Sequence, residues 1–181
     1  MRKLLNNELD RKTVEEFRKS KKSPFVIVLD NVRSHSNVGS IFRTADAFAI
    51  EAIYLCGITA TPPHREIQKT ALGATESVSW KYFPNTVSAV SSLKDEGYKI
   101  IGIEQAEGSI GLDNFQAEPG LKYALIFGHE INGVDQEVLN ICDYCVEIPQ
   151  FGTKHSFNIA ISAGIVLWEL NRPHPPYVAV G

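Results

Sequence analysis

The sequence predicts an α/β domain built on a mostly parallel sheet with helices on both faces. Two observations predict it. Short apolar runs, each the length of a buried strand, alternate along the chain with segments of helical periodicity. Several of these runs, such as residues 25–29 and 52–56, are continuously apolar, which is typical of strands covered on both faces, whereas 78–83 is a weaker strand. At 181 residues, of which 44% are apolar and 22% charged, the chain is long enough for one domain with a sizeable core.

The chain begins with a charged extension over residues 1–24. Leu9, Val14 and Phe17 give it a sparse helical stripe, and three lysines precede Pro24. We expect a solvated helix and linker here, and the alternative is a basic arm that binds a polyanion.

The compact domain is predicted over residues 25–171. The predicted strands are 25–29, 52–56, 78–83, 99–103, 123–127 and 144–148. The predicted helices are 38–48, 64–72, 86–96, 135–141 and 155–171. Residues 105–120 are polar, contain three glycines and a proline, and are expected to form a loop. The tail 172–181, rich in proline, is expected to be irregular.

The last predicted helix leaves almost no polar face. Its apolar residues are Phe157, Ile159, Ile161, Ile165, Val166, Leu167, Trp168 and Leu170. A terminal helix that is apolar all round must be covered on more than one side. One side can pack on the sheet, so the other predicts a homodimer formed through this helix.

Composition excludes several classes of function. The net charge of −3 gives no overall basic surface for nucleic acid, so such binding would need a local patch. No apolar run reaches the length of a membrane span and the polar N-terminus is unlike a signal peptide, so we expect a cytoplasmic protein. Cys56, Cys142 and Cys145 are too few for a disulfide framework. The last two form a C-x-x-C pair without the second pair that zinc requires, so we expect buried or half-buried thiols and no metal.

A polar loop follows the first predicted strand and leads into a helix. Asn37 can cap that helix, because its side chain accepts from the free N–H groups of the first turn. Gly39 allows another group to approach the backbone closely. Arg43 follows on the next turns, near the positive helix start. The arrangement predicts a site for an anionic group.

Two later stretches are of the same kind. In residues 127–134, Glu130 lies between Gly128 and Gly133, and the alternative interpretation is a glycine-bounded turn with Glu130 capping a helix start. In residues 148–158, the simpler interpretation is that Ser156 caps the last helix and Asn158 lies in its first turn.

Together the stretches predict one site, because the carboxyl ends of parallel strands share an edge of the sheet. The chain has no Gly-x-Gly-x-x-Gly and no P-loop sequence, which argues against dinucleotide or nucleoside triphosphate binding. A hydrolase using Ser156 with His35 or His129 is disfavoured because no Gly-x-Ser-x-Gly is present.

The motifs carry a family resemblance. They read Asn37-x-Gly39-x-x-x-Arg43, then Phe127-Gly128-x-Glu130-x-x-Gly133, then Ile148-Pro149 leading to Ser156-x-Asn158. In this order they resemble the motifs of the SpoU (TrmH-like) RNA methyltransferases of the SPOUT superfamily, over about residues 25–171. The resemblance implies a homodimer whose C-terminal segment forms a deep trefoil knot. It implies methyl transfer from S-adenosylmethionine to a ribose 2′-hydroxyl of RNA, with tRNA favoured over rRNA. The alternative is a catalytically silent RNA-binding module on the same fold.

The resemblance also assigns roles. Arg43 matches the catalytic arginine, Asn37 its partner, and Glu130, Ser156 and Asn158 the supporting polar residues. The positions that contact the methyl donor are Glu104, Gly128, Ile148 and Phe157. A side chain at Gly128 would push the cofactor off the strand end. Phe157 replaces the usual leucine and Gln150 a frequent methionine, so we expect a reshaped pocket that still binds the cofactor.

Overall fold

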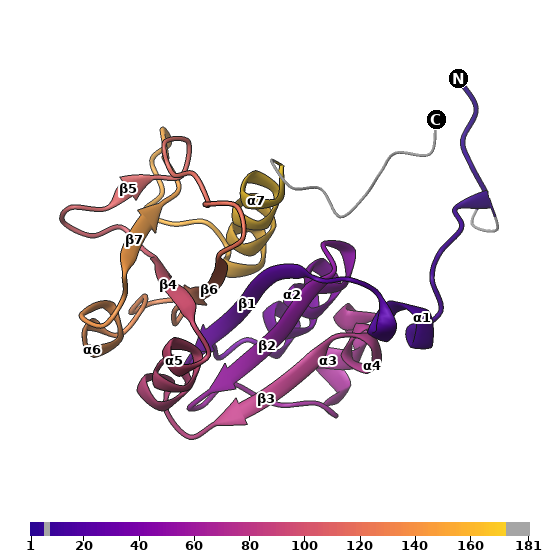
Figure 1. The fold of residues 1–181 in the computed structure, drawn as a ribbon, viewed down its shortest axis with the longest axis horizontal. Helices are drawn as coiled ribbons and strands as arrows, with labels where there is room; N and C mark the ends of the chain where they lie inside the picture. The colour runs from indigo at the N-terminus through magenta and orange to yellow at the C-terminus, as the bar shows by residue number, and fades with distance from the viewer. Residues whose placement is uncertain (6–7, 173–181) are drawn as a thin grey trace.

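A seven-stranded sheet, parallel throughout, organises the chain in the computed structural model, which describes residues 1–5 and 8–172 (Figure 1). The strands are β1 (Ser23–Asp30), β2 (Ile50–Cys56), β3 (Ser79–Phe83), β4 (Tyr98–Ile103), β5 (Ile110–Gly111), β6 (Lys122–Phe127) and β7 (Tyr144–Glu147). Their order is β3-β2-β1-β6-β4-β7-β5, with parallel pairing at each step. The chain order therefore changes direction between β1 and β6, which makes that point of the sheet edge the expected place for a site.

Helices cover both faces of the sheet. They are α1 (Val14–Lys19), α2 (His35–Ala47), α3 (Arg65–Ala71), α4 (Ala74–Ser77), α5 (Thr86–Asp95), α6 (Gln136–Leu139) and α7 (Ile159–Asn171). Phe25, Ile27 and Leu29 of β1 belong to the core shared with α1 to α4 and α7. Val26 and Val28 point to the other core, shared with α5 and α6. Both faces of β1 are buried, which explains its continuous apolar run and confirms the predicted fold class.

Two helices begin elsewhere than predicted. Ser34, not Asn37, caps α2, and its hydroxyl accepts from the N–H of Asn37 at 3.3 Å. Asn158, not Ser156, caps α7, and its side-chain oxygen accepts from the N–H of Ala160 at 2.9 Å. The start of the last helix predicted at residue 155 is therefore wrong. Residues 151–158 stay exposed ahead of the helix.

Two short elements escaped the sequence pattern. The two residues of β5 pair with β7 inside the predicted loop 105–120. The single turn of α4 lies between the predicted helix and strand on either side of it. Neither is long enough to show a period of 2 or 3.6 residues.

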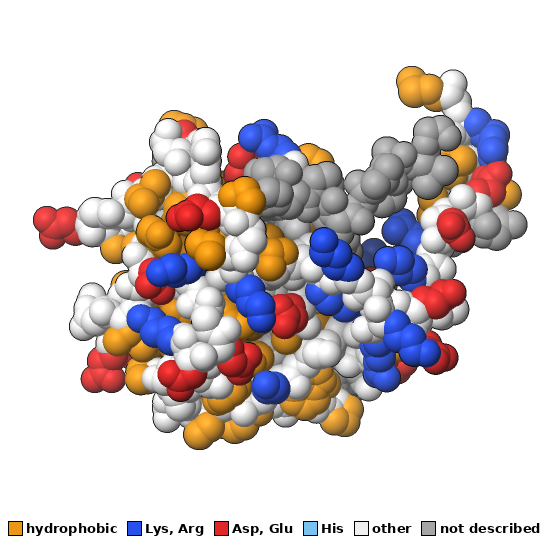
Figure 2. All heavy atoms as spheres, in the orientation of Figure 1, with side chains coloured by type: hydrophobic (Ala, Val, Ile, Leu, Met, Phe, Trp, Pro, Cys, Tyr) orange, Lys and Arg blue, Asp and Glu red, His pale blue; other side chains and the backbone are white. Residues whose placement is uncertain are grey.

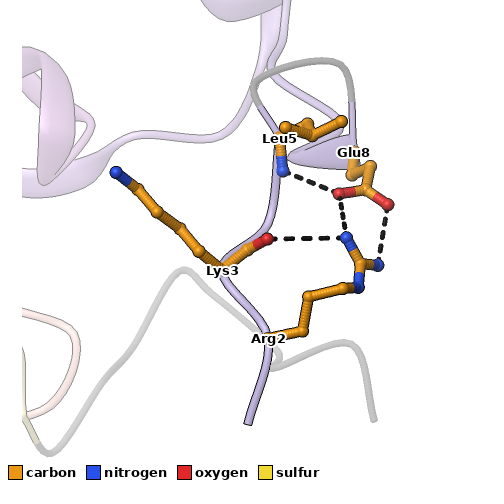
Figure 3. A network of polar contacts seen from close by, with 4 residues as sticks. All are labelled: Arg2, Lys3, Leu5 and Glu8. Atoms are coloured by element: carbon orange, nitrogen blue, oxygen red, sulfur yellow. Dashed lines mark hydrogen bonds and ion pairs between the residues drawn. The ribbon is translucent and has the colours of Figure 1, made fainter.

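The N-terminal extension is docked on the domain. Phe17 of α1 is buried in the core, so the helix is not simply solvated as expected. The Arg18 guanidinium donates to the carbonyl of Glu76 at the end of α4. Further out, Arg2 pairs with Glu8 at 2.8 Å (Figure 3).

The C-terminal tail 172–181, which was predicted to be irregular, lies outside the described residues except for Arg172. The deep knot stays a prediction. Within residues 1–5 and 8–172, no helix is long and apolar enough to span a bilayer.

Candidate functional site

A cavity of about 540 Å³ opens at the carboxyl edge of the sheet, beyond the ends of β4, β6 and β7. Its volume is in the range of sites for small organic ligands. It is lined in part by seven of the nine predicted site residues: Glu104, Gly128, Glu130, Ile148, Ser156, Phe157 and Asn158. Apolar and polar side chains are mixed in the lining, and Ile148 and Phe157 contribute apolar surface.

A chain of hydrogen bonds joins the three predicted motifs at the rim of this cavity. The Asn158 side-chain amide donates to Oδ1 of Asn37 at 3.1 Å. The Asn37 amide in turn donates to Oε1 of Glu130 at 3.3 Å. These residues follow β7, β1 and β6, respectively, so the sheet edge brings together groups that lie up to 121 positions apart.

The anion at the start of α2 is a side chain of the protein itself. Glu130 Oε2 accepts from the N–H of Arg33 at 3.0 Å, and Oε1 accepts from the N–H of Ser34 at 2.9 Å. Partial burial raises the pKa of the Glu130 carboxyl, but the hydrogen bonds from Arg33, Ser34 and Asn37 outweigh it, so the pKa is lowered. Glu130 therefore does bind the start of a helix, as the alternative interpretation expected. The helix is α2, however, and not the one that follows Glu130.

Gly128 is required by the backbone beside it. A Cβ built at Gly128 would lie 2.1 Å from the carbonyl carbon of Gly133 and 2.1 Å from the nitrogen of Val134. The sequence predicted that this glycine leaves room for a cofactor. The loop 128–134 already fills the space, so contact with that backbone is the more immediate reason for the glycine. At Gly39 the group that approaches is α3, since a Cβ there would lie 2.3 Å from the carbonyl oxygen of Ile67.

Glu104 holds the same loop from the neighbouring strand. Its Oε2 accepts from the N–H of Val134 and its Oε1 from the N–H of Gln105, both at 2.9 Å. Gly133 has a φ of +70° and leaves room for this carboxylate, because a Cβ there would lie 2.1 Å from Glu104 Oε2. Glu104 therefore positions the cavity wall as well as lining it.

Two further lining residues were not predicted as part of this site, although His129 was considered for the disfavoured hydrolase. Nδ1 of His129 accepts from the N–H of Ile131 at 3.0 Å and shapes the turn after β6. The Gln105 amide donates to the carbonyl of His155 at 2.9 Å and so connects the loop after β7 to the end of β4. A lone glutamine or histidine in a polar loop has no spacing that would distinguish it.

Arg43 is not part of this group. It is exposed on α2 and does not belong to the cavity lining. It follows Asn37 by six residues, which is about 9 Å along a helix and about 120° around it. Asn37 is also outside the lining, but its two hydrogen bonds connect it to residues that are inside.

The cysteines are buried or half-buried, as predicted. Burial raises the pKa of the Cys56 thiol to about 12 and that of Cys142 to about 11. Such thiols stay protonated at neutral pH and are poor nucleophiles. In the part of the chain that the structure describes, no group of three or more His, Cys, Asp or Glu side chains is arranged to hold a metal ion.

Comparison with known proteins gives one consistent result. Residues 24–168 match the SpoU rRNA Methylase family. RlmB of Neisseria meningitidis, a 23S rRNA (guanosine-2′-O-)-methyltransferase, is 32% identical over 149 residues, which is 82% of this chain and 58% of that protein. A putative TrmH family tRNA/rRNA methyltransferase of Staphylococcus saprophyticus is 29% identical over 147 residues, 81% of this chain and 58% of that protein. Among solved structures, the AdoMet-bound rRNA methyltransferase of Sinorhizobium meliloti has a TM-score of 0.79 and 28% identity, covering 87% of this chain and 60% of that one. This chain thus spans less than two thirds of the length of each of these proteins.

Proposed function

Because this chain belongs to the SpoU rRNA methylase family, we propose that it uses S-adenosylmethionine to methylate a ribose 2′-hydroxyl of RNA. The observation that carries the proposal is the hydrogen-bonded chain from Asn158 through Asn37 to Glu130, which joins all three motifs at one cavity. The bonds through Asn37 go beyond the capping of α2 and α7 by Glu130 and Asn158, so they favour the enzyme over a silent RNA-binding module.

The cavity suits the proposed cofactor. Its volume is adequate for a small organic ligand, and its walls offer apolar surface for a ring together with polar groups for the rest of the molecule. Gly128, Ile148 and Phe157 would hold the cofactor, with Glu104 fixing the loop between β6 and α6. When bound, S-adenosylmethionine supplies an electrophilic methyl group on a sulfonium.

Arg43 is proposed to act on the RNA. A guanidinium stays protonated in proteins, so Arg43 is unsuited to remove a proton. It binds the phosphate beside the reacting ribose, orients the 2′-hydroxyl and stabilises the negative charge that develops on its oxygen. The hydroxyl proton passes to that phosphate or to a water. Ser156 and Asn158 position the ribose at the cavity rim.

The exposed position of Arg43 supports the proposal of a second subunit. Since Arg43 lies on exposed α2 surface away from its own cavity, we propose that it serves the cavity of the partner in a homodimer. Ile161 and Trp168 of α7, which are 55% and 63% exposed, supply apolar surface for that contact. The helix α7 packs against α2, so an interface on one adjoins the other.

Replacing Arg43 tests the mechanism. Arg43→Ala is expected to lower the rate of methyl transfer by about 10²–10³ while leaving the affinity for S-adenosylmethionine unchanged. Rates are measured with radiolabelled cofactor and affinities by calorimetry. Lys94→Ala, which removes an exposed charge on α5, is the control and should be fully active. Normal turnover by Arg43→Ala would remove it from the mechanism.

tRNA is the substrate class we propose, with rRNA as the alternative. One matched relative is named for 23S rRNA and another for tRNA or rRNA, so the two classes need a direct test. Mass spectrometry of both RNAs from a strain lacking this protein would identify the nucleotide that loses a methyl group, and a loss confined to rRNA would exclude tRNA. No binding of S-adenosylmethionine in calorimetry would instead support the silent module. An RNA substrate of either class implies action in the cytoplasm.

A further inference from the structure

Two histidines at the starts of α2 and α3 stack on one another. The ring centroids of His35 and His64 lie 4.0 Å apart, with their planes inclined by 28°. His35 is the first residue of α2, and His64 immediately precedes α3. The two helices are packed closely, because Gly39 allows the Ile67 carbonyl against α2. The pair is therefore held by the helices and does not depend on a mobile loop.

The His64 ring is also fixed in orientation. Its Nδ1 accepts from the N–H of Glu66 at 3.2 Å, so His64 caps α3. His64 itself is exposed and His35 is half-buried. Imidazole faces presented to solvent and locked in place lose little conformational entropy when another flat ring stacks on them.

The pair belongs to the same helix start as residues proposed to hold the reacting ribose. His35 follows Ser34, whose N–H donates to Glu130, and precedes by two residues Asn37, which binds Asn158. Both Glu130 and Asn158 line the cavity. Residues two apart on a helix are separated by about 200°, so His35 and Asn37 lie on different sides of the first turn of α2. An RNA strand with one nucleotide at the cavity would cross the start of α2 to place a neighbouring base on the histidines.

Positive charge flanks the pair. Arg33 precedes His35 by two residues, just before α2. Arg65 directly follows His64 and begins α3. Both arginines are exposed. Flat rings for stacking combined with guanidinium groups for phosphates are the features by which proteins bind unpaired RNA.

We propose that the stacked His35–His64 pair is a platform for an unpaired base adjacent to the methylated nucleotide, with Arg33 and Arg65 contacting the flanking phosphates. The inference rests on the proposed function and adds to it the contact that holds the RNA beside the cavity. The competing explanation is that the rings only seal the contact between α2 and α3.

A double variant separates the two explanations. His35→Ala with His64→Asn removes both rings, while asparagine keeps an acceptor that caps α3 as well as histidine does. Affinity is measured by fluorescence anisotropy with a labelled oligouridylate and with its abasic counterpart, which keeps the phosphates but lacks the bases. The native protein is expected to prefer the oligouridylate by about tenfold or more, and the double variant to lose that preference.

Three further variants sharpen the result. His35→Phe keeps a ring at α2 and is expected to retain the preference for bases. Arg33→Ala and Arg65→Ala are each expected to lower the slope of log affinity against log salt by about one without changing that preference. Lys94→Ala on α5 is the matched charge control and should leave both quantities unchanged.

The outcomes are distinct. A double variant with native preference for bases, or a His35→Phe variant as impaired as the double variant, overturns the platform. These measurements need neither cofactor nor turnover. If the native protein transfers no methyl group and the double variant still loses the base preference, the proposed enzyme is overturned and the platform stands.

Discussion

At the scale of single residues, the site is built from backbone contacts as much as from side chains. Gly128 has no room for a Cβ because Gly133 and Val134 occupy that space. Both carboxylate oxygens of Glu130 accept hydrogen bonds from backbone N–H groups at the start of α2. The resemblance implies roles in cofactor binding and catalysis for these positions, and each of them has a structural role as well. Variants must therefore be designed to separate the two roles.

Gly128→Ala is predicted to displace the loop 128–134. The added carbon would lie 2.1 Å from backbone atoms, which cannot move as a flexible side chain can. We expect a loss of about 1–3 kcal/mol in the free energy of unfolding and a lower affinity for S-adenosylmethionine. Gly152→Ala is the control, because nothing lies within 4 Å of a Cβ there. Native stability of Gly128→Ala in chemical denaturation would refute the packing argument.

Glu130→Gln is predicted to be less stable than the native protein in a pH-dependent way. The folded pKa of Glu130 is lowered, so its ionised form contributes stability above the ordinary glutamate range, and this is lost as the pH falls below about 4. Melting temperatures measured from neutral to acidic pH should differ at the neutral end and converge at the acidic end. A difference that stays constant with pH would mean that the charge of Glu130 is not responsible.

At the scale of elements, the N-terminal extension is the feature whose role the sequence left open. Residues 1–22 carry eight of the 18 Lys and Arg residues but only four of the 21 Asp and Glu residues. Blue side chains are most numerous on the right of the molecule in Figure 2, around α1, and others are scattered over the rest of this face. Burial of Phe17 fixes α1 to the domain, so Arg18 and Lys19 of that helix stand at defined positions. This arrangement supports the basic-arm interpretation.

Removing three exposed lysines of this extension is predicted to weaken RNA binding. Lys12→Ala, Lys19→Ala and Lys21→Ala combined should lower the salt slope of RNA affinity by up to about three, because each contact to a phosphate releases a counterion. Filter binding over a salt series measures it. Alanine at Lys94, Lys99 and Lys122 removes the same charge elsewhere, and an equal effect from that set would point to general attraction without a defined arm.

At the scale of the whole molecule, the apolar character of α7 is only half explained by one subunit. Its buried residues face the sheet, namely Ile159, Ala163, Val166, Leu167 and Leu170. Ile161 and Trp168 remain largely exposed, and an added Cβ at Gly164 would meet nothing within 4 Å. A large exposed tryptophan on an ordered helix is typical of a surface that another subunit covers.

Ile161→Glu with Trp168→Glu is predicted to give a monomer. Two charges cannot be buried at an apolar contact without a partner, so the subunits should separate. Analytical ultracentrifugation measures the mass, and methyl transfer should fall with it if Arg43 serves the partner's cavity. Val87→Glu, at a partly exposed position on α5, is the control. A native protein that is itself monomeric at high concentration would contradict the dimer.

The sequence was sufficient to predict the fold class, six of the seven strands and the three stretches that follow β1, β6 and β7, whereas β5 was missed. Those features are local, because a continuously apolar run of strand length favours a buried strand, and glycines and polar residues mark the loop after it. Only the tertiary structure decided that Ser34 and Asn158 are the caps, that Glu130 occupies the start of α2, and that Glu104 supports the loop after β6. For each cap, several polar residues a few positions apart could serve. For the other contacts, the two partners come from distant parts of the chain. Spacing along the chain does not choose among them, whereas the order of strands in the sheet does.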